Sequence, residues 1–233
     1  MRWCMASFVV GLGAHTLQVA ATNFPVLAVE ATNYNFRLLK KSIEANPGFP
    51  SRVTAVQGAI VNGTARGRNV TMMINAQNSG GTWIQRPREA GFDERAFVFI
   101  QESVGTLTLD DLIDLQTTFR SAVVKVDIEF YECYVFGDAA ADNSGCRHFF
   151  TEFNIRAIIA EVMILADPNV EQMRCAARMI DSFSQIGFSV IYLYPSWSTF
   201  NSTSWKQNIP VGVTEVAFLR SKTDADIINK SRS

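Results

Sequence analysis

Residues 122–132 read Ala122-Val-Val-Lys-Val-Asp-Ile-Glu-Phe-Tyr-Glu132, and they indicate the class of fold more clearly than any other segment. Their first half is apolar and β-branched, which is typical of a buried strand in a parallel sheet. The run then ends in Asp127, Glu129 and Glu132, three acids that a core strand does not need. Open α/β sheets bind ligands in the crevice beyond the carboxyl ends of their strands. The stretch therefore predicts a parallel sheet with a ligand site at its edge.

Strand-like and helix-like segments alternate on both sides of this stretch, which predicts a mainly parallel sheet with helices on both faces. Strands are expected at residues 8–10, 26–29, 52–57, 70–74, 97–100, 122–126, 155–162, 189–194 and 213–219. Helices are expected at 14–21, 33–46 with Asn33 as N-cap, 109–119, 131–150 with a break near 143–145, and 170–186. Residues 1–221 are expected to form one domain, followed by a polar tail at 222–233.

Composition excludes several classes of function. Of 233 residues, 48% are hydrophobic and 18% are charged, which suits a globular core. The net charge is −1, from 21 basic and 22 acidic residues, and no basic run offers a surface for nucleic acid. No apolar stretch reaches the roughly 18 residues that a membrane span needs. The apolar start, residues 1–14, fits either a first strand, which we favour, or a signal peptide.

Cysteine and histidine content gives no expectation of a metal site. No two cysteines have the C-x-x-C spacing of a zinc or redox site, and the chain has two histidines. Buried free thiols are therefore expected at all four cysteines, Cys4, Cys133, Cys146 and Cys175.

The compartment is left open by the sequence, with the cytoplasm slightly favoured. Four N-x-S/T sequons occur, and about two would be expected by chance, so the secretory pathway is a weakly supported alternative. The sequon asparagines are Asn62, Asn69, Asn201 and Asn229.

The N-terminal third carries a nucleoside-binding pattern. Gly11-Leu12-Gly13 joins the first expected strand to a helix, where glycines let a ligand approach the backbone and the free helix amides. Glu30 ends the second strand, and an acid there can accept hydrogen bonds from both ribose hydroxyls. The alternatives are a tight turn for the glycines and a helix-dipole acid for Glu30.

Two classes of cofactor fit this pattern. A dinucleotide site prefers G-x-G-x-x-G, and the third glycine position is here Thr16. S-adenosylmethionine has no pyrophosphate, which makes it the better candidate. A nicotinamide-dependent oxidoreductase is the less favoured alternative.

Several segments together resemble the FkbM family of S-adenosylmethionine-dependent methyltransferases. They follow the order that the segments have in the family and extend over roughly residues 8–165. The family motifs are the end of a glycine motif, F-E-P-x-P-x-N, T-L-D-D-L, K-I-D-x-E-G-x-E and a later strand ending in E. The matching segments are Gly11–Leu17, Val29–Asn35, Thr108–Leu112, Lys125–Glu132 and Ile159–Glu161.

The resemblance implies a class I methyltransferase fold and O-methylation of a hydroxyl on a sugar or a small natural product. That fold is a Rossmann-like three-layer sandwich around a seven-stranded, mostly parallel sheet with an antiparallel last strand. The acceptor would be a small molecule or a glycan. Residues implied near S-adenosylmethionine are Gly11 and Gly13 at the methionine part, Glu30 at the ribose, Gln57 and Gly58 at the adenine, and His15, Ala31 and Asn35 nearby.

The acids of the opening stretch are the catalytic candidates. Asp127 is the first candidate for a general base or acceptor-orienting group, and Glu129 is the second. Alternatively, Asp127 only hydrogen-bonds the cofactor. Glu161 and Phe130 are expected near the acceptor. Glu132 fits equally well as a helix N-terminal acid.

Two departures from the family pattern support an alternative function. The strand 8–10 is followed by Gly11 and lacks the acid that the family has there. Phe130 stands where the family has a glycine, and its bulk would reshape or block the acceptor pocket. A methyltransferase-like protein that binds a ligand without catalysis is therefore the second hypothesis.

Overall fold

The computed structural model has a mixed α/β architecture whose strands divide between two sheets. It describes residues 6–10, 13–77, 82–85, 99–115, 119, 121–129, 131–139, 141–164, 170–192 and 212–220. Of the predicted site residues, Gly11 and Phe130 lie outside this part of the chain, as does the tail 222–233.

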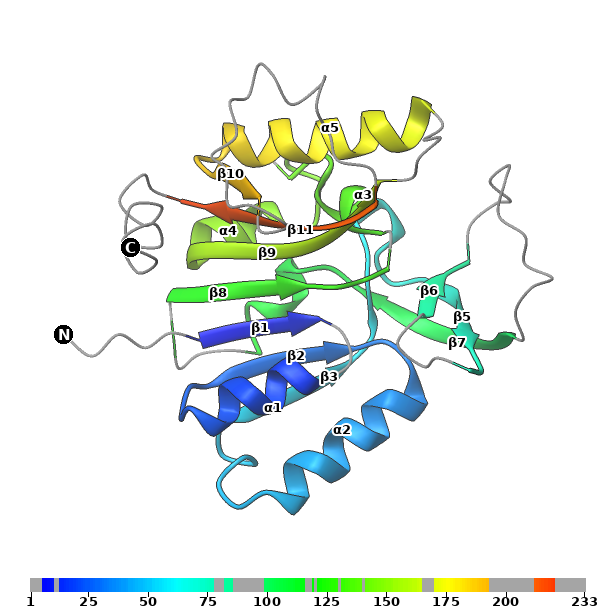
Figure 1. Ribbon diagram of the computed structural model, residues 1–233, viewed down its shortest axis with the longest axis vertical. Helices are drawn as coiled ribbons and strands as arrows, with labels where there is room; N and C mark the ends of the chain where they lie inside the picture. Colours follow the sequence, from blue (N-terminus) through cyan, green and yellow to red (C-terminus); the bar gives the residue numbers. More distant parts are fainter. Residues whose placement is uncertain are drawn as a thin grey trace.

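Seven strands form the larger sheet in the spatial order β10-β11-β9-β8-β1-β2-β3 (Figure 1). Strands β3, β2, β1, β8 and β9 run parallel, and β11 runs antiparallel to both β9 and β10. The bounds are β1 Ala6–Val10, β2 Val26–Glu30, β3 Val53–Gln57, β8 Ser121–Val126, β9 Asn154–Ile164, β10 Ser189–Tyr192 and β11 Gly212–Leu219.

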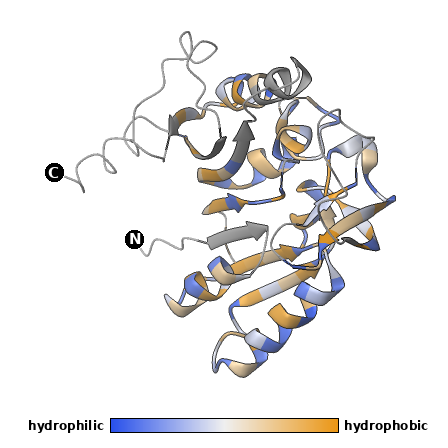
Figure 2. Cartoon of the chain, turned by 45° about the vertical axis from the view of Figure 1, so that its right-hand side comes forward, coloured by the Kyte–Doolittle hydropathy of each residue, from blue (hydrophilic) through white to orange (hydrophobic). Residues whose placement is uncertain are grey.

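Helices cover both faces of this sheet. Alternate residues of β2 face opposite sides: Val26 and Ala28 belong to one apolar cluster, and Leu27 and Val29 to another. The first cluster includes residues of α1 (Ala14–Ala21) and α2 (Asn33–Ala45). The second includes residues of α3 (Glu132–Phe136), α4 (Arg147–Glu152) and α5 (Val170–Gln185). In Figure 2 hydrophobic residues accordingly lie along the strands and on helix sides facing them.

Aromatic residues hold the second cluster together. The ring of Phe183 in α5 lies 4.5 Å from that of Phe218, 5.2 Å from Phe136 and 5.7 Å from Phe150, measured between centroids. Phe183 and Phe218 are fully buried. Tilted and edge-on contacts of this kind add to the stabilisation from burial, so they fix α3, α4 and α5 against the sheet.

A second, four-stranded sheet lies beyond the carboxyl ends of β8, β1 and β2 (Figure 1). Its order is β4-β7-β5-β6, with β4 Ala59–Ile60, β5 Asn69–Asn75, β6 Thr82–Ile84 and β7 Phe99–Leu107. The sequence predicted two short strands here but no separate sheet, so the expectation of a single seven-stranded sheet is met only in part. This second sheet faces the edge at which the candidate site was predicted.

Three predicted elements were wrong in detail. Among its described residues, the helix expected at 109–119 is the short 3₁₀ turn η3 (Asp110–Leu112), at whose start Asp111 Oδ2 accepts hydrogen bonds from the amide and hydroxyl of Thr108 at 2.9 and 2.8 Å. The break expected near 143–145 in the helix at 131–150 does separate two helices, α3 and α4, but α3 already ends at Phe136. The N-cap of α2 is Thr32 rather than Asn33, since Thr32 Oγ1 accepts a hydrogen bond from the Asn35 amide at 3.4 Å.

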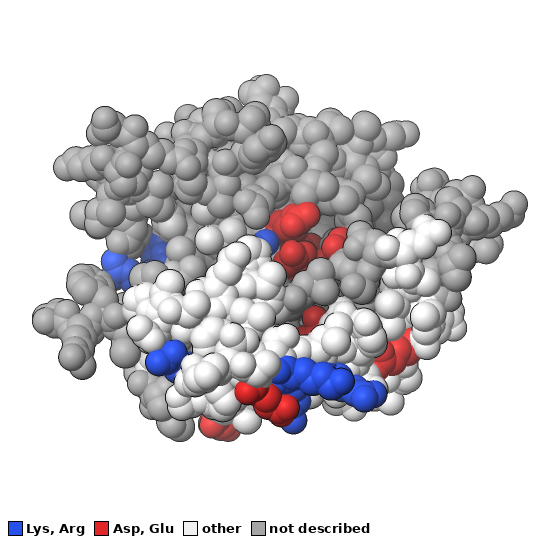
Figure 3. All heavy atoms as spheres, turned by 60° about the horizontal axis from the view of Figure 1, so that its bottom comes forward, with Lys and Arg blue, Asp and Glu red and all other residues white. Residues whose placement is uncertain are grey.

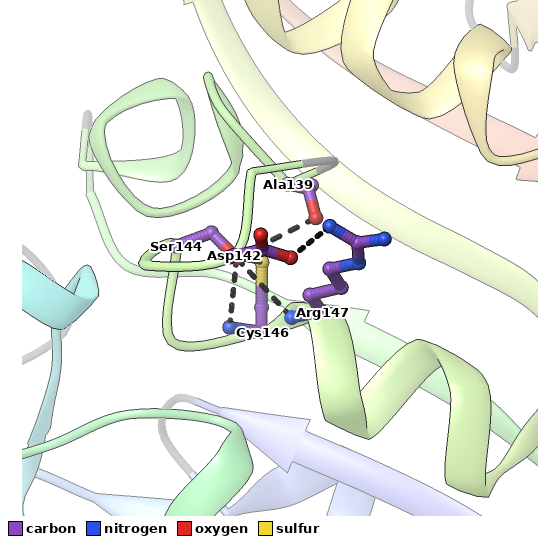
Figure 4. A network of polar contacts seen from close by, with 5 residues as sticks. All are labelled: Ala139, Asp142, Ser144, Cys146 and Arg147. Carbon is purple, nitrogen blue, oxygen red and sulfur yellow. Dashed lines mark hydrogen bonds and ion pairs between the residues drawn. The ribbon is translucent and has the colours of Figure 1, made fainter.

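The turn before α4 surrounds Cys146 with a network of polar contacts (Figure 4). Ser144 Oγ accepts hydrogen bonds from the amides of Cys146 and Arg147 at 3.3 and 3.2 Å, and Arg147 pairs with Asp142. Cys146 is a buried free thiol, as expected, and burial raises its pKa to about 12. A thiol that stays protonated is a poor nucleophile, so Cys146 is structural.

The other cysteine with a described side chain contradicts the expectation. Cys133 in α3 is disulfide-bonded, whereas free thiols were predicted throughout. Its partner is not among the side chains that the structure describes. No helix within the described ranges is long and apolar enough to cross a membrane.

Candidate functional site

The carboxyl ends of neighbouring parallel strands bring the predicted site residues into one row. Glu30, the last residue of β2, pairs with Gln57, the last residue of β3. On the other side of β2, Val29 pairs with Val10, the last residue of β1.

The row continues across β8 and β9. Val126 of β8 pairs with Val10 on one side and with Ala160 on the other. The next residues along these strands are Asp127 and Glu161. Gln57, Glu30, Asp127 and Glu161 therefore follow one level of the sheet.

Glu30 is held in place by the segment that follows it. The amide and the hydroxyl of Thr32 both donate to Glu30 Oε1, at 2.9 and 3.1 Å. Burial raises the pKa of Glu30, while hydrogen bonds from Thr32, Ala31 and Asn35 oppose that effect. Asn35 is itself buried. The predicted residues Glu30, Ala31 and Asn35 are thus brought together by the turn between β2 and α2.

Gly13 has a structural reason to be glycine. It adopts φ of +70°, a backbone conformation that favours glycine, and precedes the first turn of α1. A Cβ there would lie 3.0 Å from Leu39 Cδ1, so Gly13 also lets α1 approach α2. No side chain caps α1, and His15 is exposed in its first turn. The turn combines open helix amides with close packing.

Gly58 also has a packing explanation. A Cβ there would lie 2.6 Å from Leu107 Cδ1 of β7, at the contact between the two sheets. The Gly58 amide donates to the Glu30 carbonyl at 3.1 Å. Gly58 therefore belongs next to the site, but its lack of a side chain does not itself indicate a ligand.

Asp127 lies beside a buried lysine. The Nζ of Lys125 is 3.9 Å from Asp127 Oδ2, and the Lys125 side chain is 9% exposed against 32% for Asp127. Residues on one side of a strand repeat with a period of two, so Lys125 and Asp127 point the same way. Asp127 is thus open to a ligand while a buried cation balances its charge.

Glu129 is the strained residue of this region. Its φ is +49°, one of two positive values at non-glycine residues in the described part of the chain. Such conformations cost energy and are often found at functional sites. Burial, together with the charges of Asp127 and Glu161, raises the pKa of Glu129 to about 7, which Lys125 opposes. Glu129 can therefore exchange a proton near neutral pH.

Glu132 is the acid whose environment the sequence could not define. Its side chain is 2% exposed, and its Oε1 accepts a hydrogen bond from the Ile128 amide at 3.0 Å. Burial raises its pKa to about 7, and the charges of Asp127 and Glu129 add to that effect. It is both the first residue of α3, as expected, and the group that fixes the turn carrying Glu129.

Sequence reasoning missed Glu102. This residue lies on β7 of the second sheet, and its carboxylate oxygens are 2.9 and 3.2 Å from the Asn33 amide. A carboxylate at a helix N-terminus is stabilised by the helix dipole. The contact joins the second sheet to the first turn of α2, next to Glu30. No local pattern could reveal it, because 69 residues separate the partners.

Acidic side chains are concentrated on one face of the molecule. Figure 3 shows acidic side chains gathered near the middle of one face, next to a basic side chain. Among the described residues, no group of three or more His, Cys, Asp or Glu side chains has an arrangement that could hold a metal ion. Glu161 is partly buried at the end of the row. The site therefore offers carboxylates to a cationic or hydroxyl-bearing ligand.

Comparisons with protein families and with curated proteins give no match. The likeness to the FkbM family therefore remains a resemblance in sequence motifs.

Comparison with solved structures finds distant similarity to methyltransferases. The bifunctional kinase-methyltransferase WbdD shares 11% identity, with 92% of this chain and 34% of that chain covered and a TM-score of 0.41. Precorrin-6y C5,15-methyltransferase from Geobacter metallireducens shares 9%, with 94% and 80% covered and a TM-score of 0.40. Human methyltransferase 10 domain containing protein shares 10%, with 94% and 72% covered and a TM-score of 0.39. The chain spans about a third of the length of WbdD, and similarities this distant assign no activity.

Proposed function

We propose that the protein is an S-adenosylmethionine-dependent methyltransferase of class I fold that methylates a hydroxyl group of a sugar or small natural product. The observation that carries the proposal is the row Gln57, Glu30, Asp127 and Glu161 at the carboxyl edge of the larger sheet. Beside this row, Gly13 opens the uncapped helix α1. A ligand there would meet carboxylates and free helix amides together.

The residues present suit the cofactor chemically. S-adenosylmethionine carries a sulfonium and an ammonium, and its ribose offers two hydroxyl donors. Asp127, Glu161 and Glu30 supply acceptors with negative charge at one level of the sheet. Thr32 donates to Oε1 of Glu30, and hydrogen bonds from Ala31 and Asn35 also help to orient the carboxylate, which would accept the ribose hydroxyls at its remaining acceptor positions. Gln57 and Gly58 at the end of β3 would lie near the base.

Catalysis would depend mainly on positioning, because the sulfonium supplies an already activated methyl group. Asp127, partly exposed and fixed beside Lys125, would orient the acceptor hydroxyl. Glu129, whose pKa is raised to about 7, would accept its proton at neutral pH. Glu132 would hold the turn in which Glu129 lies, through the Ile128 amide.

The burial and the existing hydrogen bonds of Glu30 favour a second candidate function. Its side chain is only 7% exposed and already accepts hydrogen bonds from Thr32. Together with Gly11 in place of an acid after β1, this arrangement suits a protein that binds a nucleoside and does not turn over. Cofactor binding without methyl transfer would identify this case.

Transfer of labelled methyl groups tests the proposal. The full chain is incubated with S-adenosylmethionine carrying a labelled methyl group and with a panel of sugars and small polyols, and product is detected by mass. We expect a methyl ether on at least one hydroxylated acceptor, with the cofactor converted to S-adenosylhomocysteine. Binding of the cofactor without product from any acceptor would favour the second function.

A further inference from the structure

Two N-x-T sequons fall within the described residues, and the structure treats them differently. They are Asn62-Gly63-Thr64, before the 3₁₀ turn η1 (Gly63–Ala65), and Asn69-Val70-Thr71, at the start of β5. A sequon marks a residue that can accept an N-linked glycan only if its side chain is accessible.

The Asn62 amide is already engaged by the fold. Its Nδ2 donates to the carbonyl of Tyr134 at 3.2 Å, and its Oδ1 accepts from Thr64 Oγ1 at 2.6 Å. The side chain is partly buried, and the neighbouring Gly63 packs so closely that a Cβ would lie 2.1 Å from the Asn143 carbonyl oxygen. A sugar on Asn62 would break the contact with α3 and collide with the surrounding chain.

Asn69 has open surroundings. It is exposed, and its partner across the strands is Gly105 of β7, which is exposed too. A Cβ built on Gly105 would meet a single group within 4 Å, Asn69 Oδ1 at 3.9 Å. Gly67, just before the strand, has nothing within 4 Å of its Cβ position. The absence of side chains at Gly105 and Gly67 leaves room for a sugar on Asn69.

Thr71, the third residue of the sequon, also suits glycosylation at Asn69. Residues two apart on a strand point to the same side, so Thr71 shares the face of Asn69. Thr71 pairs with Ser103, a small exposed residue. The other side of this sheet is apolar, with Val104 and Met72 buried in one cluster. The sequon therefore lies where this side of the second sheet is polar and open, at the start of β5, whereas Met73, farther along the same side, is buried.

The disulfide at Cys133 points independently to the compartment in which glycans are added. Disulfides form and persist in oxidising compartments and are rare in the cytosol. Cys133 is one half of such a bond in α3. Oxidation of Cys133 and glycosylation of a sequon would take place in the same pathway.

We propose that the chain folds in the secretory pathway and that Asn69 carries an N-linked glycan, while Asn62 does not. In the reaction, Asn69 Nδ2 forms a bond to the anomeric carbon of a lipid-linked oligosaccharide pyrophosphate supplied by that pathway. The bond from this carbon to the phosphate oxygen breaks, the amide nitrogen loses one proton, and the lipid pyrophosphate leaves. The inference does not depend on methyl transfer.

Site-resolved glycan mapping tests the proposal. The full chain is expressed in cultured animal cells behind a cleavable secretory leader and purified from the medium. Release of glycans by peptide N-glycosidase in heavy-oxygen water converts each occupied asparagine to labelled aspartate, which peptide mass spectrometry locates. We expect label at Asn69 and none at Asn62. Asn69→Gln should lower the mass of the intact protein by one glycan, and the matched variant Asn62→Gln should not.

The same protein serves to test the disulfide at Cys133. We expect Cys133 to react with a maleimide only after reduction. An unlabelled Asn69 in the secreted, folded protein would overturn the proposal, as would a labelled Asn62. A Cys133 thiol that reacts without reduction would remove the argument for the oxidising compartment.

Discussion

Asp127→Asn is expected to lower the rate of methyl transfer by about 10²-fold, the loss that misplacing a reacting group by about 1 Å can cause. The amide keeps the shape of the carboxylate but loses its charge and its ability to orient and polarise a hydroxyl. The Asp127 carboxylate is a third exposed and lies 3.9 Å from the buried Lys125, so the substitution leaves the core intact. Initial rates with labelled S-adenosylmethionine would measure the loss.

The matched control is Glu44→Gln. Glu44 is an exposed acid near the far end of α2, away from Glu30 and the strand ends, so its loss should leave the rate unchanged. Full activity in Asp127→Asn would remove the mechanism and leave Asp127 with, at most, a role in cofactor binding. Unchanged affinity for S-adenosylhomocysteine together with lost turnover would assign Asp127 to the acceptor.

The second large effect is on the pH dependence of stability. Glu132 has its pKa raised from 4.5 to about 7 in the folded protein, because it is buried close to other acids. The folded state then binds a proton that the unfolded state has lost, so the free energy of unfolding falls as pH rises from about 4.5 to about 7. At about 1.4 kcal/mol per pKa unit, this loss is on the order of 3 kcal/mol.

Glu132→Gln should therefore stabilise the protein at pH 8 and have little effect at pH 5. The amide oxygen can still accept the hydrogen bond from the Ile128 amide, and the amide has no charge to bury. Urea unfolding at pH 5, 6, 7 and 8, with the disulfide intact, would measure the difference against wild type and the exposed control Glu44→Gln. Parallel pH profiles for wild type and Glu132→Gln would show that Glu132 ionises normally in the folded protein.

Much of the larger sheet could be predicted because its signals are local. The helix at 14–21 was predicted with the bounds that the structure has, and the strands at 26–29 and 52–57 within one residue. Apolar β-branched runs and a polar helix face were enough. The second sheet was harder, since its pairing of Asn69 with Gly105 depends on residues far apart in the chain.

In the candidate site too, local signals could be predicted from the sequence and long-range contacts could not. The carboxyl ends of β2, β3 and β8 could be found from sequence to within one residue, whereas β9 continues to Ile164, three residues past the Glu161 at which the sequence ended it. The contact of Glu102 with the α2 N-terminus and the burial of Glu132 depend on tertiary packing, which no local pattern encodes. The acids of Thr108–Leu112 were expected on a helix, and instead Asp110 binds the Phe149 amide at 2.8 Å.

Calorimetric titration of the purified full chain with S-adenosylhomocysteine is the decisive experiment for the proposed cofactor site. We predict saturable binding of one molecule per chain, weakened in Glu30→Ala and unchanged in Glu44→Gln. A ligand that binds only the folded protein should also raise its stability, by about 2.7 kcal/mol at a hundredfold excess over the dissociation constant. No heat of binding and no rise in melting temperature at millimolar ligand would contradict a cofactor site at the ends of β1, β2 and β8.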